Sequence, residues 1–121
     1  MSNILICDDS SLTRIQLRKI LQDEGYNVFE SINFEQIKLN TFSKKIGLCD
    51  IDLILLDVYL KNSTGFQVLK YLKNEDILIP VIMISVDNKK KVITKALDFG
   101  VADYILKPFD FSDFNVIFKH L

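Results

Sequence analysis

The sequence has few cysteines, almost no excess charge and no apolar run long enough to cross a membrane. Its two cysteines, Cys7 and Cys49, are too few for a disulfide framework, which favours a reducing compartment. The 15 basic and 16 acidic residues give a net charge of -1, so there is no electrostatic case for nucleic-acid binding. No run approaches the roughly 18 apolar residues of a membrane span, and no signal-peptide pattern opens the chain. These absences predict a cytoplasmic protein with no membrane partner and no direct nucleic-acid binding by this segment.

The length and composition predict one domain over residues 1–121. With 49% hydrophobic residues the chain can build a real core, but it is too short for two domains. No internal repeat, low-complexity segment or linker divides it.

Short apolar runs predict a parallel β-sheet. The run YNVFES at 26–31 is more polar than the others and is expected at a sheet edge. Helix-length segments separate the runs, which predicts an α/β fold with right-handed crossovers. Four runs do not alternate with polar residues, as is typical of strands covered by helices on both faces: ILIC at 4–7, LILL at 53–56, VIMI at 81–84 and YIL at 104–106.

Capping and stop residues place helices between these strands. Ser10 and Ser11 are good N-caps for the first helix, and Gly25 is a good stop after it. Three lysines at 89–91 open the fourth helix, where cations oppose the helix dipole. The expected helices are 11–24, 34–45, 65–73, 88–99 and a fifth that begins near residue 110.

Polar residues stand where the predicted strands end. Asp8 and Asp9 follow the first strand, Asp57 follows the third, Ser85 the fourth and Lys107 the fifth. Ligands of open parallel sheets bind beyond the carboxyl ends of the strands, so these groups should meet. The carboxylates suit Mg²⁺ that keeps some of its waters, with Mn²⁺ as an alternative. The four charges sum to -2, and a dication would neutralise them and leave the lysine and serine for a phosphoryl group.

In order and spacing, these residues match a known family. The motifs are DD at 8–9, LLD ending at Asp57, TG at 64–65, Ser85, and DYILKPF at 103–109. With them the whole chain resembles the CheY-like receiver domain of bacterial two-component response regulators. The resemblance implies a doubly wound, flavodoxin-like (βα)5 fold, in which a five-stranded parallel sheet of order 2-1-3-4-5 has helices on both faces.

The resemblance also implies a function in signal transduction. A histidine kinase or phosphotransfer protein would donate a phosphoryl group to Asp57 in a Mg²⁺-dependent reaction. The domain would catalyse its own phosphorylation and dephosphorylation without being an enzyme in the turnover sense. Phosphorylation would change the surface of the fourth helix, fifth strand and fifth helix. That surface would act on a downstream protein or an appended output domain, or form a phosphorylation-dependent dimer.

Individual roles follow from the same resemblance. Asp9, Asp57 and the backbone carbonyl of Tyr59 would bind the metal directly, and Asp8 would act through water. Ser85 and Lys107 would bind phosphoryl oxygens, Tyr104 would move with Ser85, and the bond from Lys107 to Pro108 would be cis.

The chain departs from the family pattern at several positions. Lys61 and Thr64 replace the usual proline and aspartate, and about four extra residues precede Asp57 in the region of the second helix. Val86 stands where a small residue is usual and would crowd the approach to the phosphoryl group. Tyr59 and Asp87 lie where the family tunes hydrolysis, and we expect the bulky Tyr59 to prolong the life of the acyl phosphate.

These residues also have ordinary structural interpretations. Adjacent aspartates can cap a helix, a lysine can extend along a surface, and serine is frequent in turns. Leu12 and Ile15, on the outer side of the first helix, are either isolated exposed residues or a docking patch for the kinase. His120 is expected to have no function.

Three other functions compete with phosphoryl acceptance. A pseudo-receiver would keep the fold and serve as a phosphorylation-independent interaction module, an interpretation supported by Tyr59 and Val86. An aspartyl-phosphate hydrolase commonly has a second aspartate two residues after its nucleophile, whereas Asp8 and Asp9 are adjacent. A flavodoxin-type cofactor domain would need a hydroxyl-rich phosphate loop after the first strand, and this sequence has none.

Overall fold

The computed structural model describes residues 2–45 and 50–121. Cys49 lies outside the described residues, as does Gly47, near which the second helix is expected to end. All five predicted strands and all five predicted helices fall within the described part of the chain.

Five parallel strands form a single sheet in the order β2-β1-β3-β6-β7. Two short strands, β4 (Tyr59–Leu60) and β5 (Ser63–Thr64), lie outside this sheet. Without them the order is the predicted 2-1-3-4-5, and the flavodoxin-like fold is confirmed. The more polar run forms an edge strand, as expected. The strands are β1 (Asn3–Cys7), β2 (Asn27–Ser31), β3 (Ile51–Leu56), β6 (Val81–Ser85) and β7 (Asp103–Leu106).

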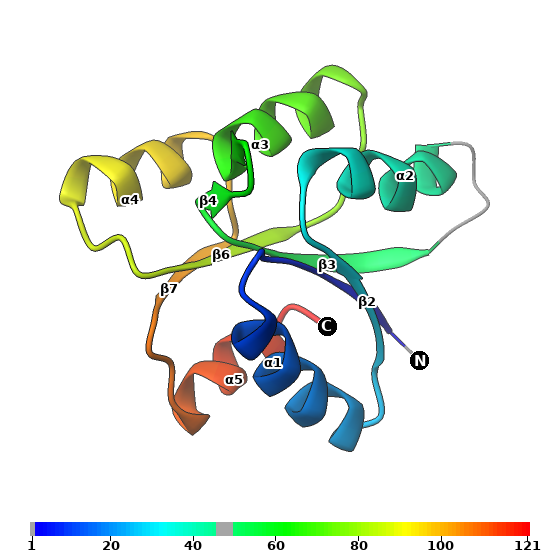
Figure 1. Ribbon diagram of the computed structural model, residues 1–121, viewed down its shortest axis with the longest axis vertical. Coiled ribbons are helices and arrows are strands. Elements are labelled where there is room, and N and C mark those ends of the chain that lie inside the picture. Colours follow the sequence, from blue (N-terminus) through cyan, green and yellow to red (C-terminus); the bar gives the residue numbers. More distant parts are fainter. Residues whose placement is uncertain (1, 46–49) are drawn as a thin grey trace.

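Helices cover both faces of this sheet (Figure 1). One layer contains α2 (Phe34–Lys45), α3 (Gly65–Asn74) and α4 (Lys90–Asp98). The other contains α1 (Ser11–Asp23) and α5 (Phe111–Phe118). The central strands are therefore buried on both sides, which explains why their sequences are continuously apolar.

The core consists of two apolar clusters separated by the sheet. Successive residues of a strand belong to different clusters, because their side chains point to opposite faces of the sheet. Leu5 of β1 packs in the cluster beneath α2, α3 and α4, whereas Ile4 and Ile6 pack toward α1 and α5. On α1, Leu17 and Leu21 are fully buried in the second cluster, because residues four apart lie on the same face of a helix.

Side-chain caps define where most helices begin. Ser10 accepts a hydrogen bond from the Thr13 N–H at the start of α1. Thr64 and Asp110 form capping boxes at the starts of α3 and α5. The N-cap of α4 is Lys89, whose side chain makes no capping hydrogen bond to the described residues. This helix begins at Lys90, two residues later than expected, because its lysines offer no acceptor for the free N–H groups.

A short hairpin between β3 and α3 was not predicted. It pairs β4 (Tyr59–Leu60) with β5 (Ser63–Thr64) in antiparallel fashion, and Asn62 in its turn has a φ of 62°. Asparagine tolerates this left-handed conformation better than most residues. The hairpin holds Tyr59 just beyond Asp57.

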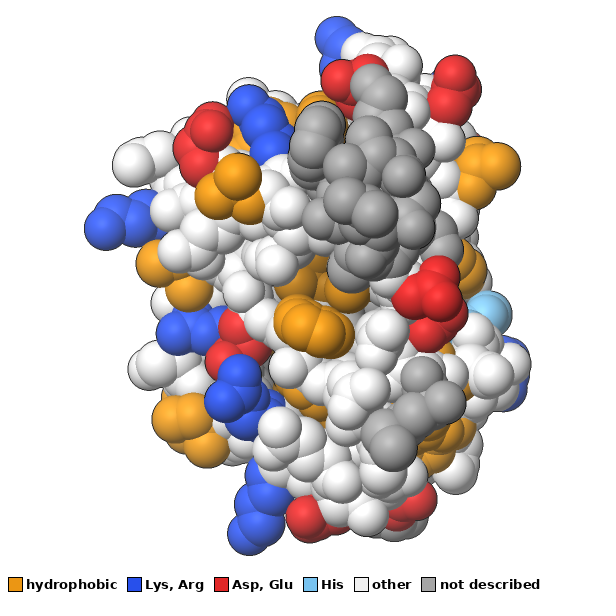
Figure 2. Space-filling view, turned by 90° about the vertical axis from the view of Figure 1, so that its right-hand side faces the viewer, with side chains coloured by type: hydrophobic (Ala, Val, Ile, Leu, Met, Phe, Trp, Pro, Cys, Tyr) orange, Lys and Arg blue, Asp and Glu red, His pale blue; other side chains and the backbone are white. Residues whose placement is uncertain are grey.

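Among the described residues, the surface at the amino ends of the strands carries charges of both signs. Figure 2 shows this side of the molecule, on which acidic and basic side chains are interspersed with small apolar areas. Among the described residues, no helix is both long enough and apolar enough to span a bilayer.

Candidate functional site

The site lies at the carboxyl ends of the strands, where backbone hydrogen bonds align neighbouring loops. The Asp57 N–H donates to the Cys7 carbonyl at 2.9 Å, which places Asp57 beside the end of β1. The Lys107 N–H donates to the Ser85 carbonyl at 2.9 Å, which aligns the ends of β6 and β7. The strand ends therefore bring together groups that are far apart in sequence.

Lys107 connects two of the three predicted carboxylates. Its Nζ lies 2.7 Å from Asp8 Oδ2 and 2.9 Å from Asp57 Oδ2. Asp8 is 2% exposed and Asp57 8%, so one shared ammonium group compensates two largely buried charges. The peptide bond between Lys107 and Pro108 is cis.

The pKa shifts of Lys107 and Asp8 reflect this shared environment. Burial lowers the pKa of Lys107, but hydrogen bonds to Asp8 and Asp57 outweigh burial, and the pKa lies above its usual value. Burial raises the pKa of Asp8, although Lys107 and the Ser10 N–H partly oppose the shift. Lys107 therefore carries its charge at neutral pH.

The carboxylates have the composition of a magnesium site. Asp8, Asp9 and Asp57 each offer one oxygen atom, and these atoms lie within 4.8 Å of one another. Asp9 is exposed, unlike its two partners, so a cation there would keep contact with water. Oxygen ligands, few protein groups and retained water suit Mg²⁺. With Lys107 the cluster carries -2, which one dication would neutralise.

Ser85 and Tyr104 both contact the backbone of Asp87. Ser85 is fully buried, and its Oγ accepts a hydrogen bond from the Asp87 N–H at 3.2 Å. The Tyr104 hydroxyl donates to the Asp87 carbonyl at 2.7 Å, and burial raises the pKa of this tyrosine. The loop after β6 thus links the two residues that are expected to move together.

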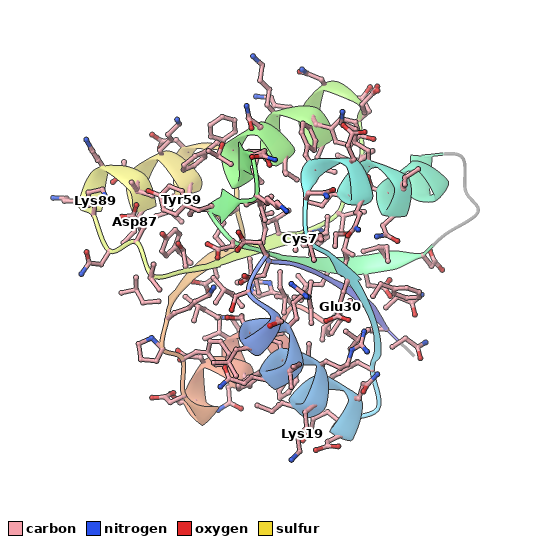
Figure 3. All side chains as sticks on the ribbon, in the orientation of Figure 1. Cys7, Lys19, Glu30, Tyr59, Asp87 and Lys89 are labelled. Carbon is pink, nitrogen blue, oxygen red and sulfur yellow. The ribbon has the colours of Figure 1, made fainter. Side chains whose placement is uncertain are left out.

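The side chain of Asp87 connects Tyr59 of β4 with Lys89, the N-cap of α4 (Figure 3). Tyr59 donates its hydroxyl to the Asp87 carboxylate, and Lys89 Nζ lies 3.1 Å from Asp87 Oδ2. The bond from Tyr59, followed by the contacts of Lys89, lowers the pKa of Asp87 to about 2. Asp87 raises the pKa values of Tyr59 and Lys89. The sequence pointed to Tyr59 and Asp87 but not to Lys89. Three lysines follow one another at 89–91, and the sequence does not show which of them pairs with Asp87.

Gly65 allows α3 to approach Asp57 closely. A Cβ atom at this position would lie 2.4 Å from the Asp57 carbonyl oxygen and 2.7 Å from Met83 Cε. The Gly65 N–H donates to the Val58 carbonyl at 2.6 Å. Any larger residue would displace the backbone that carries Asp57, which explains the glycine of the TG motif.

A hollow of about 380 Å³ lies beside Lys107. Val86, which is 68% exposed, and Leu12 line it together with Phe109. Val86 thus stands at the mouth of the site rather than in the core.

Comparison with known proteins assigns this arrangement to a family. The profile of the response regulator receiver domain matches residues 4–119. The chain belongs to this family. It is 33% identical over 116 residues to the transcriptional regulatory protein MalR of Bacillus subtilis, a match that covers 95% of this chain and 48% of MalR. The chain thus spans about half the length of MalR and of the other transcriptional regulatory proteins it matches.

Solved structures of receiver proteins have the same fold. A two-component response regulator from Clostridium difficile superposes with a TM-score of 0.84 at 25% identity, covering 98% of this chain and 93% of that one. The response regulator TrrA of Thermotoga maritima, crystallised with Mg²⁺-BeF, gives a TM-score of 0.83 at 24% identity, and the match covers both chains completely.

Magnesium should stabilise the folded domain. At a free concentration ten times its Kd, a ligand that binds only the folded state adds about 1.4 kcal/mol, which corresponds to a rise in Tm of about 5 °C. We expect Asp9→Asn to lose most of this rise, and Asp23→Asn, at the far end of α1, to keep it. Thermal unfolding at constant ionic strength measures both, and a wild-type Tm that does not respond to Mg²⁺ would contradict the site.

Proposed function

We propose that this receiver domain accepts a phosphoryl group on Asp57 from a phosphohistidine of a kinase or phosphotransfer protein, in a Mg²⁺-dependent reaction. The observation that carries the proposal is the double contact of Lys107 with Asp8 and Asp57 beside three convergent carboxylate oxygens. The Mg²⁺-BeF complex of TrrA and a phosphorylated response regulator structure from Burkholderia pseudomallei support it by analogy.

Metal binding would involve the acidic cluster and the adjoining hairpin. Asp9, Asp57 and the Tyr59 carbonyl would hold Mg²⁺ directly, and Asp8 would hold it through water. The ion, when bound, lowers the electrostatic cost of bringing an anionic phosphoryl group to an acidic site.

The transfer itself is an in-line displacement at phosphorus. A carboxylate oxygen of Asp57 forms the new P–O bond while the P–N bond to histidine breaks and its electron pair stays on the imidazole. Lys107 binds one phosphoryl oxygen and Ser85 donates its hydroxyl to another. The fixed strand ends supply the positioning on which such a reaction depends.

Phosphorylation would then pull on the loop after β6. Asp57 exchanges one negative charge for nearly two on the acyl phosphate. The Ser85 hydroxyl, which accepts from the Asp87 N–H, would move toward the phosphoryl group, and Tyr104 donates to the carbonyl of the same Asp87. This linkage is how a local charge would change the surface of α4, β7 and α5.

The output of this domain is a second part of the proposal. We propose that residues 1–121 form one receiver domain whose output is a separate domain, as the length of MalR suggests, or a downstream protein. We further propose that Leu12 and Ile15 form the surface on which the phosphodonor docks, because they are 64% and 63% exposed on the outer face of α1.

Phosphate labelling tests the central proposal. With a small phosphodonor and Mg²⁺ we expect acid-labile phosphate to be incorporated once per chain, and we expect Asp57→Asn or removal of Mg²⁺ to abolish it. Asp23→Asn serves as a charge-matched control that should label normally. A folded wild-type protein that stays unlabelled would instead indicate an interaction module, and repeated turnover of a phosphate monoester would indicate a hydrolase.

The bridge between Tyr59 and Asp87 should prolong the phosphorylated state. The tyrosine ring, held by its hydroxyl, limits the access of water to the acyl phosphate. We expect Tyr59→Asn to shorten the phosphate half-life several-fold and Tyr59→Phe to have a smaller effect, because the ring remains. Release of phosphate from pre-labelled protein measures this, and an unchanged half-life in Tyr59→Asn would refute the shielding role.

Docking can be separated from chemistry with a second pair of variants. We expect Ile15→Ala to slow transfer from the protein donor several-fold while labelling by a small phosphodonor stays normal. Leu39→Ala removes an apolar side chain of α2 that is 75% exposed, compared with 63% for Ile15, and should affect neither reaction. If Ile15→Ala slowed phosphoryl transfer from both donors equally, the docking role of Ile15 would be refuted.

A further inference from the structure

Arg14 on α1 contacts both the loop after β1 that carries Asp8 and Asp9, called the acidic loop below, and the neighbouring edge strand β2. Its Nη1 donates to the backbone carbonyl of Asp8 at 2.7 Å. Its Nε lies 3.4 Å from Glu30 Oε1, and both side chains are largely buried, 18% and 25% exposed. Figure 3 shows Glu30 between β2 and α1. One side chain therefore fixes the loop after β1 to strand β2.

The backbone of Asp8 is held on both sides by these contacts. Its N–H donates to the Ser31 carbonyl at 3.1 Å, and its carbonyl accepts from Arg14. Strand β2 provides both anchors, Ser31 directly and Glu30 through Arg14. Because a peptide unit is planar, fixing the Asp8 carbonyl also fixes the orientation of the peptide plane that joins Asp8 to Asp9.

Asp9 depends on this backbone for its orientation. Its carboxylate is exposed, and no hydrogen bond to another described residue holds it. Asp8 and Asp57, by contrast, are held through their side chains by Lys107. The direction of the Asp9 side chain toward the cluster is thus set by the peptide that Arg14 restrains.

We infer that Arg14 is a positioning residue for the metal site, an inference that rests on the proposed Mg²⁺-dependent function. Groups that orient metal ligands typically contribute 10–100-fold to metal affinity. Simple charge predicts the opposite sign, since a guanidinium near a dication repels it and its removal would tighten binding. The two explanations can therefore be distinguished by the direction of the change.

Arg18 provides a matched control within the same helix. It also pairs with Glu30, through Nη2 and Oε2, but among the described residues it has no hydrogen bond to Asp8. Arg18→Ala removes the same charge from the same carboxylate and leaves the contact with the acidic loop intact.

The test measures the Kd of Mg²⁺ by calorimetry or amide shifts at constant ionic strength, with Tm as a check of folding. We expect Arg14→Ala to weaken Mg²⁺ binding about tenfold and Arg18→Ala to change it less than about twofold. Without metal, the amide signals of Asp8 and Asp9 should move in Arg14→Ala and stay in place in Arg18→Ala.

Several results would overturn the inference. A Kd for Arg14→Ala that is unchanged, tighter or equal to that of Arg18→Ala would remove the positioning role. If Arg14→Ala does not fold, Arg14→Lys is compared with Arg18→Lys. Lysine lacks the separate Nη1 and Nε donors with which Arg14 contacts Asp8 and Glu30, so equal Kd values in the two lysine variants would again contradict the inference. If wild-type protein binds no Mg²⁺, the proposed function is contradicted as well. If wild-type protein binds Mg²⁺ and the Arg14 variants do not differ from the Arg18 variants, only the role of Arg14 is contradicted.

Discussion

The ammonium group of Lys107 lies between Asp8 and Asp57, at separations of 99 and 50 residues along the chain, and the rest of the site depends on this contact. Without it, three carboxylates at one edge of the sheet would repel one another, and two of them are nearly buried. One cation does not complete the neutralisation, so the cluster keeps a net charge of -2. That remaining charge makes the site suited to a dication and, after the dication, to an anion.

Three features keep this charged site in a defined geometry. Backbone hydrogen bonds link the ends of neighbouring strands, Gly65 allows α3 to pack against the Asp57 carbonyl, and Arg14 restrains the acidic loop from the side of β2. On the other side, Asp87 joins Ser85 and Tyr104 through its backbone, and Tyr59 and Lys89 through its carboxylate. Asp8 and Asp57 are thus held by several contacts, whereas Ser85 at the end of β6 and Tyr104 in β7 both contact the backbone of Asp87.

Much of the fold followed from the hydrophobic pattern, because strands buried on both faces leave a clear signal. The runs at 4–7, 53–56 and 81–84 became central strands, and the polar run at 26–31 became an edge. The hairpin of β4 and β5 escaped prediction since two-residue strands have no periodicity. The start of α4 was placed two residues too early, because the lysines at its amino end offer no capping acceptor. The roles of individual site residues remain predictions.

The sequence by itself determined the chemistry available at the sheet edge. Asp8, Asp9, Asp57, Ser85 and Lys107 follow their strands directly, and parallel strands must end on the same side. Only the tertiary structure decided the pairing: Lys107 contacts Asp8 and Asp57 but leaves Asp9 exposed, and Arg14 reaches the Asp8 carbonyl. Residue spacing limits which groups can meet, but side-chain directions and packing between distant segments determine which of them do.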